Sequence, residues 1–153
     1  MPSLKIGSIA PEFITTDQDG KTIRLTDFKG KKVILYFYPK DNTPGCINEA
    51  CNLQENLKKL YKSNFVVLGV SADNETSHKK FALKYSLTFP LLVDTEKSII
   101  KEYKAWGKKA LYGKIFNGIL RKTYVIDEQG KIENVIEKVV TKNHTSQIFE
   151  PYI

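Results

Sequence analysis

Two short runs of β-branched and aromatic residues constrain the fold more than any other feature of this chain. Residues 33–38 read Val-Ile-Leu-Tyr-Phe-Tyr, and residues 65–70 read Phe-Val-Val-Leu-Gly-Val. Such near-continuous apolar runs are typical of strands that are buried on both faces of a sheet. Between them, Leu53, Leu57 and Leu60 form an apolar stripe at helical spacing that runs towards Lys62. A buried strand, a helix and a second buried strand predict an α/β fold.

The remaining segments extend this alternation. Turn signals at Asp19-Gly20 and Lys29-Gly30 predict an N-terminal hairpin followed by a short helical turn. Further strands are predicted at residues 91–93, 122–127 and 131–135, and further helices around residues 81–85, at 97–103 and at 145–149. Strands that alternate with helices and end in a hairpin imply a thioredoxin-like three-layer α/β fold. Its central sheet is mixed, and the hairpin is an N-terminal extension.

Length and charge narrow the class of protein. A chain of 153 residues without repeats or a linker is expected to form a single domain over residues 1–153. The net charge of +7 comes almost entirely from scattered lysines, which favours a solvated surface over nucleic-acid binding. No apolar run approaches the ~18 residues of a membrane span, and no leader pattern is evident. We therefore expect a cytoplasmic protein that binds neither membranes nor nucleic acid.

The two cysteines, Cys46 and Cys51, are too few for a secreted disulfide framework. Their spacing alone leaves two interpretations open: buried inert thiols or redox chemistry. Metal binding is disfavoured because only His78 and His144 could join them, and no second cysteine pair exists. Both histidines are expected to be surface residues.

The position of Cys46 favours reactivity. A buried strand stops at Pro39, and Thr43 and Pro44 are suited to the cap and first position of a helix. Cys46 would then lie in the first turn of that helix, beyond the carboxyl end of a strand, where α/β proteins collect catalytic groups. Backbone N–H groups and the helix dipole stabilise an anion there, so we expect Cys46 to form a thiolate at neutral pH.

The segment around this cysteine resembles the active-site segment of the peroxiredoxins, specifically the bacterioferritin comigratory protein or peroxiredoxin Q subfamily. The match covers residues 37–46, Phe-Tyr-Pro-Lys-Asp-Asn-Thr-Pro-Gly-Cys, followed by Glu49-Ala50-Cys51. The family motif has a proline seven residues and a threonine three residues before the attacking cysteine, as Pro39 and Thr43 stand here. Similar blocks recur along most of the chain, at residues 10–13, 25–31, 70–73, 89–94, 112–114 and 118–127.

The resemblance implies a thiol peroxidase that reduces hydrogen peroxide and organic hydroperoxides. Cys46 would attack the peroxide and become a sulfenic acid, and Cys51 would resolve it in an intramolecular disulfide. Thioredoxin or a similar dithiol protein would recycle the enzyme, without metal, haem or flavin. No downstream cysteine is available to resolve a partner subunit, which favours a monomer.

Further residues receive roles around the sulfur. The Thr43 hydroxyl would donate to the sulfur or to the peroxide, although it could serve only as a helix cap. Arg121, one of two arginines, would hold the thiolate and polarise the leaving oxygen, although a lone arginine is more often on the surface. The substrate-binding group comprises Pro39, Gly45, Tyr38 and Glu49: Gly45 offers an amide, Tyr38 and Glu49 shape the site, and Pro39 excludes water or only ends the strand.

Two positions depart from the subfamily pattern. Ile47 replaces the usual threonine, and residues 52–55, Asn-Leu-Gln-Glu, replace an aromatic-basic-acidic run. Neither change removes a group that transfers a proton. Two rival functions remain: a thioredoxin-like dithiol oxidoreductase, whose cysteines usually stand two residues apart, and a basic binding module with incidental cysteines.

Overall fold

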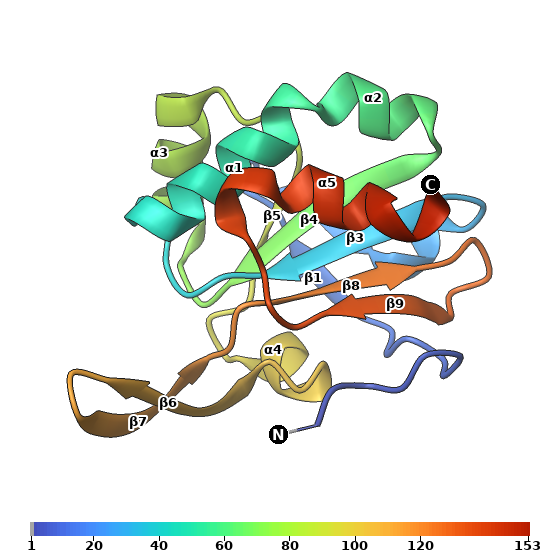
Figure 1. Cartoon of the computed structure of the whole chain (residues 1–153). Coiled ribbons are helices and arrows are strands. Elements are labelled where there is room, and N and C mark those ends of the chain that lie inside the picture. Colours follow the sequence, from blue (N-terminus) through green and yellow to red (C-terminus); the bar gives the residue numbers. More distant parts are fainter. Residues whose placement is uncertain (1) are drawn as a thin grey trace.

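The computed structural model describes residues 2–153 and forms a layered α/β structure around one sheet (Figure 1). The strands are β1 (Ile14–Thr16), β2 (Thr22–Arg24), β3 (Lys32–Phe37), β4 (Phe65–Ser71), β5 (Leu91–Val93), β6 (Trp106–Leu111), β7 (Lys114–Ile119), β8 (Lys122–Ile126) and β9 (Ile132–Ile136). The α-helices are α1 (Pro44–Glu55), α2 (Leu57–Lys62), α3 (Glu75–Tyr85), α4 (Ser98–Glu102) and α5 (His144–Phe149). Single 3₁₀ turns cover Leu25–Phe28, Thr141–Asn143 and Glu150–Tyr152.

The central sheet has the strand order β5-β4-β3-β8-β9. The first three strands are parallel, whereas β8 runs antiparallel to β3 and β9 antiparallel to β8. The sheet is therefore mixed, as the sequence predicts. The predicted N-terminal hairpin is also confirmed, because β1 and β2 pair outside this sheet.

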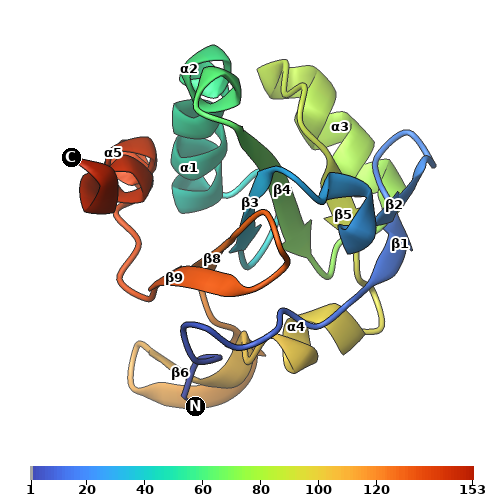
Figure 2. The same cartoon turned by 90° about the vertical axis from the view of Figure 1, so that its right-hand side faces the viewer.

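Strand β3 shows why the run at residues 33–38 is apolar throughout. Its odd-numbered side chains enter one apolar cluster together with residues of α4 and the N-terminal hairpin. Its even-numbered side chains enter a second cluster together with α1, α2, α3 and α5. Helices thus cover both faces of the sheet (Figure 2), and the three-layer prediction is confirmed.

Pairing within the sheet sets the position of the site. Phe37, the last residue of β3, pairs with Lys122, the first residue of the antiparallel β8. Arg121 therefore lies beside the loop that leaves β3 and enters α1. The parallel strand β4 ends at the same edge of the sheet, at Ser71. Three segments that are distant in sequence consequently meet at the N-terminus of α1.

The helical region after β3 differs from its prediction in one respect. The stripe of Leu53, Leu57 and Leu60 is buried as predicted, but the helix is interrupted at Asn56, between α1 and α2. The Asn56 side chain donates to the carbonyl of Asn52 at 2.8 Å and competes with the backbone bonds of a continuous helix.

The sequence patterns do not predict the hairpin of β6 and β7, which projects from the body of the molecule (Figure 1). Most of its side chains are at least partly exposed, including Tyr112 at the turn, and Tyr112 and Gly113 both have positive φ. A hairpin without a buried face lacks the alternation of apolar and polar residues that marks a strand.

The helices are short. The longest, α1, has 12 residues. Within residues 2–153, no helix combines the length and apolar character that crossing a membrane requires.

Candidate active site

Cys46 lies in the first turn of α1, as predicted. Thr43 is the N-cap with an extended backbone, Pro44 is the first helical residue, and Asn42 turns the chain with a φ of 59°. No acidic side chain occupies the first turn, so the positive end of the helix dipole is not compensated there. The Cys46 side chain is only 1% exposed and packs among apolar residues of the second cluster.

Arg121 binds Cys46 and Glu49 at the same time. Its Nη2 donates to Cys46 Sγ at 3.3 Å, and its Nη1 donates to Glu49 Oε1 at 2.7 Å. Burial lowers the pKa of Arg121, but the charges of Cys46 and Glu49 outweigh burial and raise it. The structure thus places a permanent cation at the sulfur. From the sequence alone, Arg121 is only one of two arginines that could have this position.

Gly45 permits this arrangement. A Cβ atom at Gly45 would lie 3.1 Å from Arg121 Nη2, which is closer than an ordinary van der Waals contact. A larger residue would therefore displace the guanidinium from the sulfur. The absence of a side chain at Gly45 therefore leaves the guanidinium room to approach the sulfur.

Thr43 and Pro39 flank this turn. Thr43 has the predicted N-cap position, but its hydroxyl donates to the carbonyl of Lys40 at 2.8 Å rather than to the helix backbone. The expected side-chain cap is thus wrong. The hydroxyl would have to leave Lys40 to donate to the sulfur or to a peroxide. Pro39 is half-buried in the loop after β3.

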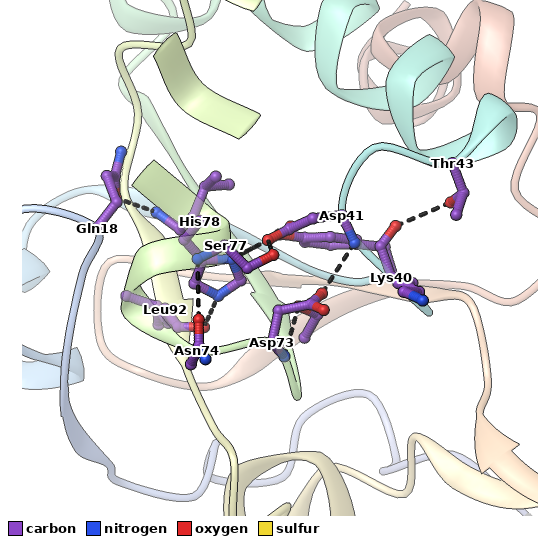
Figure 3. A network of polar contacts seen from close by, with 12 residues as sticks. Gln18, Lys40, Asp41, Thr43, Asp73, Asn74, Ser77, His78 and Leu92 are labelled. Carbon is purple, nitrogen blue, oxygen red and sulfur yellow. Dashed lines mark hydrogen bonds and ion pairs between the residues drawn. The ribbon is translucent and has the colours of Figure 1, made fainter. Parts of the chain in front are cut away.

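Tyr38 is fully buried, and its hydroxyl belongs to a polar network around Asp41. Figure 3 shows Asp41, Ser77 and His78 of this network. Tyr38 donates to Asp41 Oδ1 at 2.6 Å. Asp41 Oδ2 accepts from Ser77 Oγ at 2.8 Å and lies 2.7 Å from His78 Nδ1. The Asp41 amide donates to Asp73 Oδ2 at 2.8 Å. This network fixes the loop that precedes Thr43. Tyr38 therefore shapes the site indirectly, through the position of this loop.

Asp41, Asp73 and His78 could offer three metal ligands, since one atom of each lies within 4.8 Å of the others. Their atoms are already engaged, however. His78 Nε2 donates to the carbonyl of Leu92, both Asp41 oxygens accept hydrogen bonds, and Asp73 Oδ2 accepts from Ser71 and from the Asp41 amide. We assign this cluster a role in holding the loop and assign it no metal.

The expectation that both histidines are surface residues is wrong. His78 and His144 are each 0% exposed. His144 Nε2 lies 2.8 Å from Thr123 Oγ1 and 3.4 Å from Glu49 Oε2, directly behind the arginine pair. Burial lowers the pKa of His144 to about 4. No local sequence pattern indicates this burial, because β8 and α1 are far from α5 along the chain and bury His144 only after folding.

Glu49 is the most deeply buried acid of the site, at 0% exposure. Burial raises its pKa to about 7, against the lowering effect of Arg121. From the sequence, Glu49 is expected to shape or support the site around Cys46. Its contact with Arg121, which also contacts Cys46, is consistent with that expectation.

Cys51 lies on the same helix as Cys46, and both thiols are free. Burial and the charge of Glu55 raise the pKa of Cys51. On a regular helix, Cα atoms five residues apart are about 8.5 Å from each other. A disulfide requires about 7 Å or less, with side chains that point towards each other. The two thiols cannot bond while α1 is intact.

Comparison with known proteins identifies many similar chains. The model of the AhpC/TSA family matches residues 6–135. Peroxiredoxin Bcp of Escherichia coli is 44% identical over 144 residues, which cover 94% of this chain and 92% of that protein.

Solved structures agree with the family match. A mutant of Xylella fastidiosa PrxQ is 29% identical, with a TM-score of 0.91, and the match covers 99% of this chain and 97% of that one. The Xanthomonas campestris bacterioferritin comigratory protein, studied for alkyl peroxide reduction, is also 29% identical, with a TM-score of 0.85 over 91% and 88% of the two chains.

Proposed function

The chain belongs to the AhpC/TSA family and is a thioredoxin-fold thiol peroxidase, and from this premise we propose that Cys46 attacks the peroxide and that Cys51 resolves the oxidised sulfur. One observation carries the assignment. Arg121 Nη2 donates to Cys46 Sγ in the first turn of α1, so the arginine and the helix dipole both favour a thiolate at this cysteine.

In the first step, the Cys46 thiolate attacks the terminal oxygen of a peroxide ROOH. The S–O bond forms while the O–O bond breaks, and the departing RO⁻ takes up a proton and leaves as an alcohol, or as water from hydrogen peroxide. The sulfur is oxidised by two electrons and the peroxide is reduced by two. Arg121 stabilises the charge on the departing oxygen, and the Gly45 and Cys46 amides and the Thr43 hydroxyl are further donors.

In the second step, the Cys51 thiolate attacks the Cys46 sulfenic acid. A disulfide forms, and the hydroxyl leaves as water after it takes up a proton. Since α1 keeps the two sulfurs apart, its first turns must unwind before this step. Unwinding also frees Cys51 from the burial and the Glu55 charge that raise its pKa.

A reduced dithiol protein such as thioredoxin then restores both thiols by disulfide exchange. Both cysteines belong to one helix, so a single chain suffices for the cycle and we propose a monomer. We propose the cytoplasm as its location, because two free thiols need a reducing compartment. The alkyl peroxide reduction studied for the Xanthomonas campestris relative supports organic hydroperoxides as substrates beside hydrogen peroxide.

Counting free thiols within seconds of mixing reduced protein with a slight excess of hydrogen peroxide tests the proposal. A thiol peroxidase loses both thiols rapidly, and reduced thioredoxin with its reductase then supports continuous peroxide consumption. A dithiol oxidoreductase or a binding module keeps its thiols over the same time, and that result would refute the proposed function.

A further inference from the structure

One oxygen of Glu49 is unsatisfied in the buried site. Oε1 accepts from Arg121, but Oε2 has no hydrogen-bond partner among the residues that the structure describes. Nε2 of His144 lies 3.4 Å from Oε2. An ionised oxygen buried without a donor keeps the full cost of its desolvation. A proton on Oε2 would remove that charge.

The hydrogen bonds of Gln147 determine where His144 carries its own proton. Gln147 Nε2 donates to the carbonyl of Lys138 at 2.8 Å, and Gln147 Oε1 accepts from the amide of Val140 at 2.9 Å. These two bonds fix the orientation of the Gln147 amide. His144 Nδ1, 2.8 Å from Oε1, must therefore donate to it. In the neutral ring Nε2 carries no proton and accepts from the Thr123 hydroxyl at 2.8 Å.

An ionised Oε2 without a donor and an unprotonated Nε2 3.4 Å away would repel each other, so burial favours the state in which Oε2 carries a proton. We propose that Glu49 carries a proton on Oε2, that the unprotonated Nε2 of His144 favours this state, and that this proton sets how much of the positive charge of Arg121 acts on Cys46. His144 is thus a positioning residue, acting through Glu49 and Arg121. The inference rests on the proposed function only for its consequence, the rate of peroxide reduction.

The consequence follows from charge. When Glu49 holds the proton, the positive charge of Arg121 has no carboxylate to neutralise it and acts fully on the sulfur. When Glu49 is ionised, the same guanidinium is neutralised 2.7 Å from its Nη1 and stabilises both the thiolate and the charge on the departing oxygen less. Burial raises the pKa of Glu49 to about 7 and lowers the pKa of His144 to about 4, so the proton belongs to Glu49 below neutral pH.

Other charged or titratable groups face this pair. Arg121 approaches from the start of β8, Cys46 from α1 itself, and Tyr36 from β3, where burial and then the Glu49 charge raise the Tyr36 pKa. Lys109 of β6 faces Arg121, and burial and Arg121 lower its pKa. Because the thiolate is the species that attacks the peroxide, its fraction must be measured separately in each variant.

The test measures the rate of Cys46 oxidation by hydrogen peroxide in single turnovers between about pH 5 and about pH 9, divided by the thiolate fraction from ultraviolet absorbance. In wild type, we expect this corrected rate to fall as pH rises through about 7, where Glu49 ionises. In Glu49→Gln, the amide keeps both contacts without titrating, so the fall should disappear. In His144→Gln, the amide donates to Glu49 Oε2 and the fall should move to lower pH by about one unit, a roughly tenfold effect at a fixed pH.

Thr123→Val is a matched variant with the opposite expected sign. It removes the hydroxyl that competes for His144 Nε2 and should move the fall to higher pH. If His144→Gln does not fold, Thr123→Val still tests the proposal. An equal reduction of the corrected rate at every pH, or the same shift in a Glu49→Gln background, would assign His144 a merely structural role and overturn the inference.

A second measurement is independent of peroxidase activity. Infrared difference spectra should show the C=O band of a protonated carboxyl group that disappears as pH rises through about 7, is absent in Glu49→Gln and is shifted in His144→Gln. If the band is absent from wild type, Glu49 holds no proton and the inference is wrong. If the band behaves as expected but hydrogen peroxide leaves the thiols unchanged, the proposed function fails while the proton on Glu49 stands.

Discussion

Helix α1 carries two cysteines in opposite surroundings, one in its first turn and one in its middle. At the first turn, Cys46 is buried, touches a guanidinium and faces the positive end of the helix dipole. Further along, Cys51 is half-buried, its main charged neighbour is Glu55, and burial and Glu55 raise its pKa. The same residue type on the same helix is therefore favoured as a thiolate at one position and disfavoured at the other.

This difference gives the two thiols an order of reaction. Cys46 is prepared to react first while the helix is folded, whereas Cys51 becomes a better nucleophile only after the helix unwinds. The two parts of the helix also have different partners. Arg121 binds Cys46 in the first turn, and the C-terminal segment binds Asn52, the residue after Cys51. Asn52 Oδ1 accepts from the amide and the hydroxyl of Thr145, and Asn52 Nδ2 donates to the carbonyl of Lys142.

Exchanging each cysteine for serine should give the largest contrast. Cys46→Ser should abolish peroxide reduction, because a hydroxyl is not a comparable nucleophile at neutral pH. Cys51→Ser should consume one equivalent of peroxide, react with a sulfenic-acid probe and lose most thioredoxin-coupled turnover. Peroxide consumption is the measurement. If Cys46→Ser consumes peroxide over multiple turnovers, the roles assigned to the two cysteines are wrong.

Changes at Arg121 should have the next largest effect. Arg121→Met removes the cation and two aligned donors, and we expect the peroxide rate to fall about 100-fold to 1,000-fold. Arg121→Lys keeps the charge without the planar fork, so its rate should lie between the two. The exposed Arg24 provides a matched control, since Arg24→Met should react at the wild-type rate. Equal rates of Cys46 alkylation in wild type and Arg121→Met would mean that the arginine does not act on the sulfur.

Hydrogen exchange can test whether α1 unwinds. In the reduced protein, the amides of residues 47–53 should be protected, because both cysteines lie within an intact helix. In the disulfide form these amides should exchange at least tenfold faster, while those of β3 and β4 remain unchanged. Equal protection in both redox states would contradict the need for unwinding.

The hydrogen bonds of Asn52 should control how easily α1 unwinds around Cys51. Asn52→Ala removes three hydrogen bonds to the C-terminal segment, each contributing about 1 kcal/mol. We expect the disulfide to form up to about tenfold faster after peroxide addition and the midpoint of thermal unfolding to decrease by about 6–12 °C. Asn48→Ala on the same helix is the control, because no side-chain hydrogen bond of Asn48 is recorded in the part of the chain that the structure describes. If both variants form the disulfide at the wild-type rate, the C-terminal segment does not restrain the helix.

The smallest effect should be the pH dependence of wild-type stability. Burial lowers the pKa of His144 from 6.5 to about 4, so its contribution is complete above 6.5 and is lost as pH falls towards 4. Burial raises the pKa of Glu49 from 4.5 to about 7, so its contribution is complete below 4.5 and is lost as pH rises towards 7. Each change is on the order of 3 kcal/mol, and the two should largely cancel between pH 4.5 and 6.5.

Removing one member of the pair should expose the contribution of the other. In denaturant titrations, Glu49→Gln should become more stable as pH rises through this window, whereas His144→Gln should become less stable. If the free energy of unfolding changes with pH in the same direction in both variants, burial does not shift the pKa values of Glu49 and His144 in opposite directions.

The sequence by itself determined the local parts of this protein. The β-branched runs specify β3 and β4, and the contiguous residues 39–46 contain the strand end, the turn, the cap and the thiol, so both the helix start and Cys46 within it could be predicted. These features depend on backbone preferences and on neighbours a few residues apart. The β6–β7 hairpin escaped prediction because a mostly solvated hairpin needs no apolar pattern.

Only the tertiary structure decided which distant groups act on the sulfur. Arg121 reaches Cys46 because β3 and β8 pair with Phe37 opposite Lys122, 85 positions apart in the chain. His144 is buried behind Glu49 because α5 packs on α1 beside β8, and nothing around His144 in the sequence distinguishes it from a surface histidine. How deeply a group is buried and which charges surround it are properties of the folded structure. The reactivity of Cys46 and the protonation of Glu49 therefore follow from contacts that no local sequence pattern contains.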